Sequence, residues 1–344
     1  MKVHTALRRL FDVRGSPRCM VVIRYGIAGH PVQQSLSPLL MALVADHLRL
    51  PSDSKSLELE IVDATSIHDA LAWGYAGAVP SPLVWDCTNG EFGKFRTSTL
   101  LGKAVEKARD ITEASPLLGE AKDTTLPPQT AAGLPTRMFD SEIWLNLTSP
   151  LKHQLDSSAV QCIDDAMDIK AVNALRWDGK GWWCAGLDGQ GIVDVLAHHD
   201  VLPSRHVLGL VGGGGAARST ASAWIRHNGR LHPLSSRRDL EHEALDTAIT
   251  DALPDAVVDF DGTYTESDGS ALVVKAAYSP VKGDANARLH QLASTPLDGR
   301  WLLVAQHLAC WRALWAPERA EALPSLPLLL TKLVEAEAML ASYA

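Results

Sequence analysis

The sequence lacks the cysteine pattern of a disulfide-stabilised or zinc-binding protein. Its five cysteines, in 344 residues, are scattered, odd in number and without CxxC spacing. This usage argues against a disulfide framework and a zinc site, and it fits a reducing compartment. We therefore expect a cytoplasmic protein without a bound metal.

An excess of basic charge and long apolar runs are also missing. The net charge of −8 and the pI of about 5.9 do not suit a protein that grips nucleic acid. No apolar run approaches the ~18–20 residues needed to span a bilayer, so we expect no membrane partner. Residues 1–19 carry arginines but no apolar core of a signal peptide, and we interpret them as a loose extension.

The apolar content of 46% is typical of a globular protein, and the length predicts two domains. Short apolar runs alternate with amphipathic stretches, which predicts α/β architecture with parallel strands. Strands are expected at 20–28, 57–62, 143–147, 207–211, 230–235, 256–260 and 271–275. Helices are expected at 38–48, 66–75, 97–110, 215–227, 302–315 and 328–340. Ser37 suits the cap of the first helix and Pro38 its first turn.

A glycine run follows the expected strand 207–211 and opens a helix. Residues 212–217 (GGGGAA) match G-x-G-x-x-A, the dinucleotide-binding fingerprint in its alanine variant. Gly212 permits the tight turn, Gly214 lets a pyrophosphate approach the backbone, and Ala217 allows close packing of helix on strand. Gly215 and Ala216 place the helix N-terminus at the anion. The run therefore predicts a nucleotide site.

The end of the next strand indicates which nucleotide is bound. An NAD site places Asp or Glu there to accept the ribose 2′-hydroxyl, whereas this chain has Ser236, Arg237 and Arg238. A hydroxyl and two guanidinium groups suit a 2′-phosphate. We therefore expect NADP (NADPH), with NAD less favoured.

Lys152, at the end of a predicted strand, and Asp188, in a Leu-Asp-Gly sequence, form a candidate acid–base pair. Interconversion of a ketone and an alcohol needs a hydride and one proton, and the proton donor must reach the oxygen. A lysine oriented by an aspartate can fill that role. A lysine and an aspartate are more often a surface salt bridge, so the residues alone leave both readings open.

Several stretches also match motifs in a fixed order. Residues 29–38 (GHPVQQSLSP) fit G-x-P-x-x-x-S-x-S-P in full. Partial matches to N-V-T-x-P-x-K, A-V-N-T-L, N-T-D-G, G-A-G-G-A-x-R and N-G-x-x-M-L-V-x-Q occur at residues 146–152, 171–175, 186–189, 212–218 and 298–306. Together these motifs resemble the shikimate dehydrogenase family.

The resemblance implies a role for each matching residue. Lys152 and Asp188 would be the catalytic pair. A set of short polar side chains would hold the carboxylate and hydroxyls of shikimate: Ser35, Ser37, Thr148, Asn173, Tyr278 and Gln306. The implied reaction is the reversible, NADPH-dependent reduction of 3-dehydroshikimate to shikimate in aromatic amino acid biosynthesis.

The chain departs from the family at several positions. Gly186 and Leu187 replace Asn-Thr before the aspartate, and 259–261 (DFD) replaces N-A-T, which would bring two carboxylates towards a cofactor phosphate. Leu302 replaces the methionine near the nicotinamide, and Trp301 beside it could narrow the pocket. An insertion at about 76–138 lengthens the first domain.

We therefore predict two α/β domains with the active site in the cleft between them. Residues 20–187, completed by 302–344, would bind substrate, and 188–301 would form a Rossmann-like NADP-binding domain. The chain would act as a monomer or homodimer on a small molecule. Three alternatives stay open: a shikimate/quinate dehydrogenase-like paralogue with a different substrate, a non-catalytic nucleotide or metabolite sensor, and a methylene-tetrahydrofolate dehydrogenase.

Overall fold

A computed structural model describes residues 22–50, 57–75, 98–122, 141–234, 237–240, 247–265, 271–278 and 283–342. The expected N-terminal extension, most of the insertion and Ser236 lie outside these ranges. Of the helices within them, none is long and apolar enough to cross a membrane.

The first half of the chain builds a mixed sheet of six strands in the order β2-β1-β3-β5-β6-β4. β1, β2 and β3 run parallel, whereas β5 runs antiparallel to both β3 and β6. Their bounds are β1 Val22–Gly29, β2 Leu57–Asp63, β3 Ser141–Leu147, β4 Val160–Cys162, β5 Ala174–Trp177 and β6 Trp182–Ala185. The predicted strands at 20–28, 57–62 and 143–147 are confirmed, and β4 to β6 were not predicted.

The second sheet has four strands, all parallel, in the order β10-β9-β7-β8. It forms from β7 Val207–Val211, β8 Arg230–Pro233, β9 Ala256–Asp259 and β10 Leu272–Lys275. β7 is buried at all five positions, as expected of a central parallel strand covered on both faces. The predicted parallel sheet is confirmed, and its strands all fall within 188–301.

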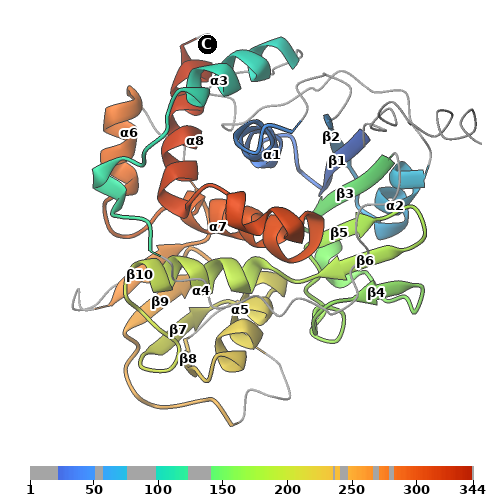
Figure 1. The fold of residues 1–344 in the computed structure, drawn as a ribbon. Helices are drawn as coiled ribbons and strands as arrows, with labels where there is room; N and C mark the ends of the chain where they lie inside the picture. The colour runs from blue at the N-terminus through green and yellow to red at the C-terminus, as the bar shows by residue number, and fades with distance from the viewer. Residues whose placement is uncertain are drawn as a thin grey trace, which may run out of the picture.

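Helices separate and cover the two sheets (Figure 1). α4 and α7 lie side by side across the middle of the molecule, and α1, α3 and α8 pack together at one end. The bounds are α1 Ser37–His47, α2 Ile67–Tyr75, α3 Ser98–Arg109, α4 Asp188–His198, α5 Gly215–Arg226, α6 Ala285–Leu292, α7 Arg300–Cys310 and α8 Leu326–Ala341. Short turns of helix occur at Pro116–Leu118, Leu151–His153, Trp311–Trp315 and Pro317–Ala322.

The C-terminal helices pack on the first sheet through tryptophans. The rings of Trp144 on β3 and Trp315 stack with centroids 5.7 Å apart, and Trp311 meets Trp144 edge-on at 5.0 Å. The Trp315 indole also donates to the carbonyl of Leu175 on β5. Large buried aromatics of this kind contribute strongly to stability. These tryptophan contacts hold the C-terminal part of the chain against the first sheet.

Candidate active site

A pocket of about 260 Å³ is lined by residues at the carboxyl ends of strands from both sheets. Its walls come from the carboxyl ends of β1, β3, β9 and β10 and from the first turns of α1, α4, α5 and α7, which is where ligands bind in open α/β sheets. Seven of the eight predicted catalytic and substrate residues line it: Ser35, Ser37, Thr148, Lys152, Asp188, Tyr278 and Gln306.

Lys152 and Asp188 meet at one wall of this pocket. The Lys152 ammonium donates to Asp188 Oδ2 at 2.5 Å, with side-chain exposures of 20% and 2%. Asp188 is the first residue of α4, where the helix dipole stabilises a carboxylate. This pair is therefore largely enclosed and faces a cavity, unlike a surface salt bridge.

Asn173 lies beside Asp188 and outside the pocket wall. Its amide donates to Asp188 Oδ1 at 2.8 Å, and its Oδ1 accepts from the backbone N–H of Leu187 at 2.7 Å. Asn173 is buried and is not part of the pocket wall. It lies behind Asp188 and orients the carboxylate, and the substrate contact expected of it stays a prediction.

The two serines at the start of α1 lie at the pocket wall. The predicted cap is wrong: Leu36 is the N-cap residue of α1 and makes no side-chain cap, while Ser37 is already helical. The Ser35 hydroxyl accepts from the backbone N–H of Ser37 at 3.2 Å. Ser35, not Ser37, therefore binds a free N–H of the first turn of α1, and both serines line the pocket.

Asn146 is a polar residue of the pocket that sequence reasoning left out of the site. Its Oδ1 accepts from the Tyr25 hydroxyl at 2.7 Å, and its amide donates to the carbonyl of Asn173 at 3.1 Å. Burial raises the pKa of Tyr25 well above its ordinary value, so the phenol stays protonated as a donor. The signal was present, because Asn146 opens the motif that contains Lys152.

The glycine loop has the geometry expected of a nucleotide site. Gly212 adopts φ +129°, a conformation that favours glycine, and Gly214 is the N-cap of α5 with no heavy atom near the place of a Cβ. A Cβ at Gly213 would lie 2.1 Å from the carbonyl oxygen of Asp239. Gly213 therefore also has to be glycine, a requirement the motif alone did not indicate.

The arginine segment after β8 packs directly on this loop, since the carbonyl of Arg238 also abuts Gly213. Arg237 and Arg238 are exposed, and the Arg237 guanidinium donates to the carbonyl of Asp261 at 3.1 Å. The carboxylate of Asp261 accepts from the backbone N–H of Arg237 at 2.9 Å. Asp261 therefore helps to hold the arginine segment in place.

Asp259, one of the two carboxylates expected near a cofactor phosphate, binds within its own loop. The Asp259 carboxylate is 2% exposed and accepts four backbone N–H groups of its own loop, those of residues 261–264. Its charge is satisfied within the loop, as is typical of a buried carboxylate. Asp261, by contrast, places its Oδ1 3.5 Å from the Cβ position of Gly212, so one of the two carboxylates does lie beside the glycine loop, as expected.

Of two other departures from the family, one lies outside the pocket wall and one lines it. Trp301 was expected to narrow the pocket, but it is 1% exposed, donates to the carbonyl of Leu292 and packs on His198 and His199. Leu302, in place of the methionine, does line the pocket. The expectation about Trp301 is therefore wrong.

Position 186 has little room for a side chain because another segment packs against it. A Cβ there would meet the Ala166 Cβ at 2.8 Å and the Ala171 carbonyl at 3.0 Å. We expect Gly186→Ala to lower the free energy of unfolding by about 1–3 kcal/mol, the usual cost of overpacking. Urea denaturation measures this loss, with Gly102→Ala as control, because Gly102 is exposed on α3 and has no atom within 4 Å of its Cβ position. Equal stability of the two variants would contradict this packing.

Among the described residues, no group of three or more His, Cys, Asp or Glu side chains could hold a metal ion. Cys310 is buried beside Asn146, and burial raises the pKa of its thiol well above its ordinary value. A thiol in that state is a poor nucleophile. Cys310 is therefore not a candidate nucleophile of this pocket.

Comparison with known proteins gives a consistent picture. No protein-family model matches the chain. It is 27% identical over 301 residues to the shikimate dehydrogenase (NADP(+)) of Methylibium petroleiphilum, covering 84% of this chain and 80% of the relative. It is 29% identical over 201 residues to the enzyme of the same name from Halobacterium salinarum, covering 51% and 75%.

Solved structures share the fold. Shikimate 5-dehydrogenase from Thermus thermophilus in complex with shikimate superposes with a TM-score of 0.52 at 19% identity, covering 92% of this chain and 99% of that one. Its complex with NADP(H) and shikimate gives 0.52 at 18% identity, covering 92% and 100%. These similarities confirm the predicted two-domain α/β fold with a Rossmann-like domain.

Proposed function

We propose that this chain, a relative of the shikimate dehydrogenases, is itself an NADP-dependent shikimate dehydrogenase. The observation that carries the proposal is the Lys152–Asp188 pair, which faces a pocket also lined by Ala216 of the α5 N-terminus. The acid–base pair and the cofactor loop thus share one cavity. Its volume of about 260 Å³ suits a small ring acid.

The glycine loop and the arginine segment fit a dinucleotide. The loop would hold the pyrophosphate at the N-terminus of α5, and the guanidinium groups of Arg237 and Arg238 would hold a 2′-phosphate. Ser236 remains a predicted contributor. When bound, reduced nicotinamide supplies the hydride.

The chain itself supplies the proton and the orientation. Lys152 holds a proton at Nζ and gives it to the ketone oxygen of 3-dehydroshikimate as that oxygen becomes a hydroxyl. Asp188 keeps the ammonium aimed into the pocket, because its Oδ1 is fixed by Asn173 and its Oδ2 by Lys152. The lysine then regains a proton from water, and the same groups run the reaction in reverse.

The remaining polar side chains of the pocket would bind the substrate carboxylate and hydroxyls. The Tyr278 hydroxyl lies 3.4 Å from the carbonyl oxygen of Gln34, and Gln306 projects from α7. With Ser35, Ser37 and Thr148, they supply the short hydrogen-bonding groups that a polyhydroxy acid requires. Residues 20–187 with the C-terminal helices would form the substrate domain, in a cytoplasmic monomer or homodimer.

Arg237 tests the cofactor assignment. We expect Arg237→Ala to lower kcat/KM for NADP at least about tenfold and to leave that for NAD nearly unchanged, because a charge-assisted bond to the 2′-phosphate is lost. Steady-state kinetics with each cofactor measures this. Arg230→Ala, an exposed arginine on β8, is the matched control. Equal losses with both cofactors would contradict the proposed phosphate contact.

The function itself is tested by absorbance of reduced nicotinamide. Purified protein is mixed with shikimate or quinate, and with NADP or NAD. We expect reduction of NADP with shikimate to be fastest. A faster reaction with quinate would favour the paralogue, and no reaction in any combination would favour the sensor.

A further inference from the structure

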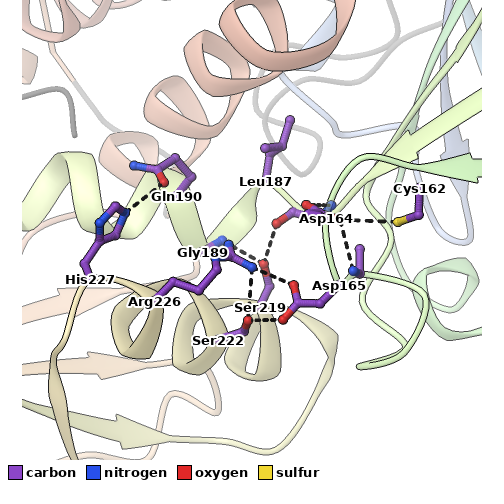
Figure 2. Close-up of polar contacts among 12 residues, drawn as sticks. Cys162, Asp164, Asp165, Leu187, Gly189, Gln190, Ser219, Ser222, Arg226 and His227 are labelled. Carbon is purple, nitrogen blue, oxygen red and sulfur yellow. Dashed lines mark hydrogen bonds and ion pairs between the residues drawn. The ribbon is translucent and has the colours of Figure 1, made fainter. Parts of the chain in front are cut away.

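The two halves of the molecule are joined by a polar interface between residues 163–171 and α5. Figure 2 shows its outer part: Asp165 accepts from both Ser222 and Arg226 of α5, the latter at 2.6 Å. Nearby, the Ser219 hydroxyl accepts from the N–H of Gly189 at 2.9 Å and donates to the carbonyl of Gly186 at 2.8 Å. This interface therefore reaches the turn that carries Asp188.

Arg218, one turn into α5, spans the inner part of the same interface. Its guanidinium donates to three backbone carbonyls: Ile169 at 2.7 Å, Lys170 at 2.8 Å and Gly213 at 2.8 Å. Two of these belong to the substrate side and the third to the glycine loop. A planar fork with several fixed donors can join such acceptors, which a single ammonium cannot do equally well.

The bond to Gly213 fixes how the glycine loop presents its amides. A trans peptide points its C=O and its following N–H in opposite directions. Because Arg218 holds the carbonyl of Gly213, the N–H of Gly214 is turned to the other side of the loop. That N–H lies at the N-cap of α5, where the pyrophosphate would bind.

The bonds to residues 169 and 170 hold the segment that supports Lys152. Lys170 has φ +53°, a left-handed conformation that residues other than glycine rarely adopt, and Arg218 binds its carbonyl. Two residues later, the N–H of Val172 donates to the carbonyl of Lys152 at 3.0 Å. The place of a Cβ on Gly215 is 3.4 Å from the Lys152 Cβ, so loop and lysine are in contact.

We propose that Arg218 is a positioning residue that sets the cofactor loop in register with Lys152. It acts through backbone carbonyls and touches neither substrate nor the reacting atoms. The inference rests on the proposed function, because it assumes that hydride and proton are delivered in one pocket. It predicts that loss of Arg218 weakens cofactor binding and lengthens the path of hydride transfer.

The test compares Arg218→Gln with Arg226→Gln. Both substitutions remove an arginine that joins α5 to residues 163–171. Arg226 binds Asp165 and Ser222, whereas Arg218 also binds the glycine loop. The NADPH Kd is measured by fluorescence titration without substrate. The primary isotope effect is then measured with NADPH deuterated at the transferred position, and the thermal midpoint records stability.

We expect Arg218→Gln to raise the NADPH Kd at least about tenfold and to change the isotope effect, since hydrogen bonds to a charged group are lost. Arg226→Gln should keep the Kd within about twofold while its thermal midpoint falls. An unchanged Kd in Arg218→Gln, or the same rise in both variants, would overturn the proposal. Because the Kd needs no turnover, an inactive wild-type protein would refute the proposed function without removing this test.

If Arg218→Gln does not fold, Arg218→Lys carries the test. Lysine keeps the charge but cannot hold three carbonyls in the same geometry. Its NADPH Kd should lie above that of the wild type and of Arg226→Gln. A wild-type Kd in Arg218→Lys would overturn the proposal.

Discussion

Lys152→Ala is expected to lower kcat/KM for shikimate by about 10²–10⁴-fold, the usual contribution of a positioned proton donor. The Lys152 amine meets Asp188 at the pocket wall, and alanine leaves no group there to take the proton of the reacting hydroxyl of shikimate or to return it to the ketone oxygen in the reverse reaction. The NADPH Kd should change by no more than about twofold, because only the lysine stem approaches the glycine loop, at Gly215. Steady-state kinetics and fluorescence titration measure the two quantities.

Lys107→Ala is the matched control for that experiment. Lys107 is an exposed lysine on α3, outside the pocket wall, so its removal should leave kcat/KM unchanged. Full turnover in Lys152→Ala would refute the assignment of Lys152 as proton donor. A large increase in its NADPH Kd would mean instead that the lysine serves the cofactor.

Glu337→Ala is expected to lower the free energy of unfolding by about 3 kcal/mol, the lower end of the cost of breaking a buried ion pair, because Arg300 keeps its ion pair with Asp298. Arg300 and Glu337 are each 1% exposed, and the guanidinium donates to both carboxylate oxygens at 2.8 and 2.9 Å. The pair joins α8 to the start of α7. Urea denaturation measures the loss.

A surface pair provides the control for Glu337. Lys122→Ala removes a bridge to Asp200 whose partners are 35% and 85% exposed, and it should cost no more than about 1 kcal/mol. A similar loss in the two variants would contradict the structural role of the buried pair. Arg300 follows Gly299 of the pocket wall and lies 5.3 Å from the Tyr278 ring centroid, so we also expect a higher KM for shikimate in Glu337→Ala.

The sequence predicted the strands that alternate with helices well and missed the three short strands β4 to β6. Strands β1, β3 and β7 are apolar runs with helices between them, and this periodicity is a strong signal. β5 and β6 have four residues each and include tryptophans and an arginine whose burial depends on Glu142 across the sheet. One signal was available: Asp178-Gly179 is a hairpin turn in which Gly179 has φ +95° and Asp178 accepts from the N–H groups of Lys180 and Gly181.

The candidate site was predicted in its members and less well in their roles. Motif order brought together residues far apart in the chain, because each motif stands at the end of a strand or the start of a helix. The roles of Asn173, Asp259 and Trp301 depend on which neighbour each side chain meets. Those neighbours are set by the packing of segments that are distant in the chain, and the spacing of residues in the sequence does not specify that packing.

The most direct test of the central claim follows one deuterium atom. Protein is incubated with 3-dehydroshikimate and NADPH deuterated at the transferred position, and the product is analysed by mass spectrometry. We predict shikimate that carries a single deuterium on the ring carbon bearing the new hydroxyl, with product formation lost in Lys152→Ala. No product, or shikimate without deuterium, would contradict direct hydride transfer in this pocket.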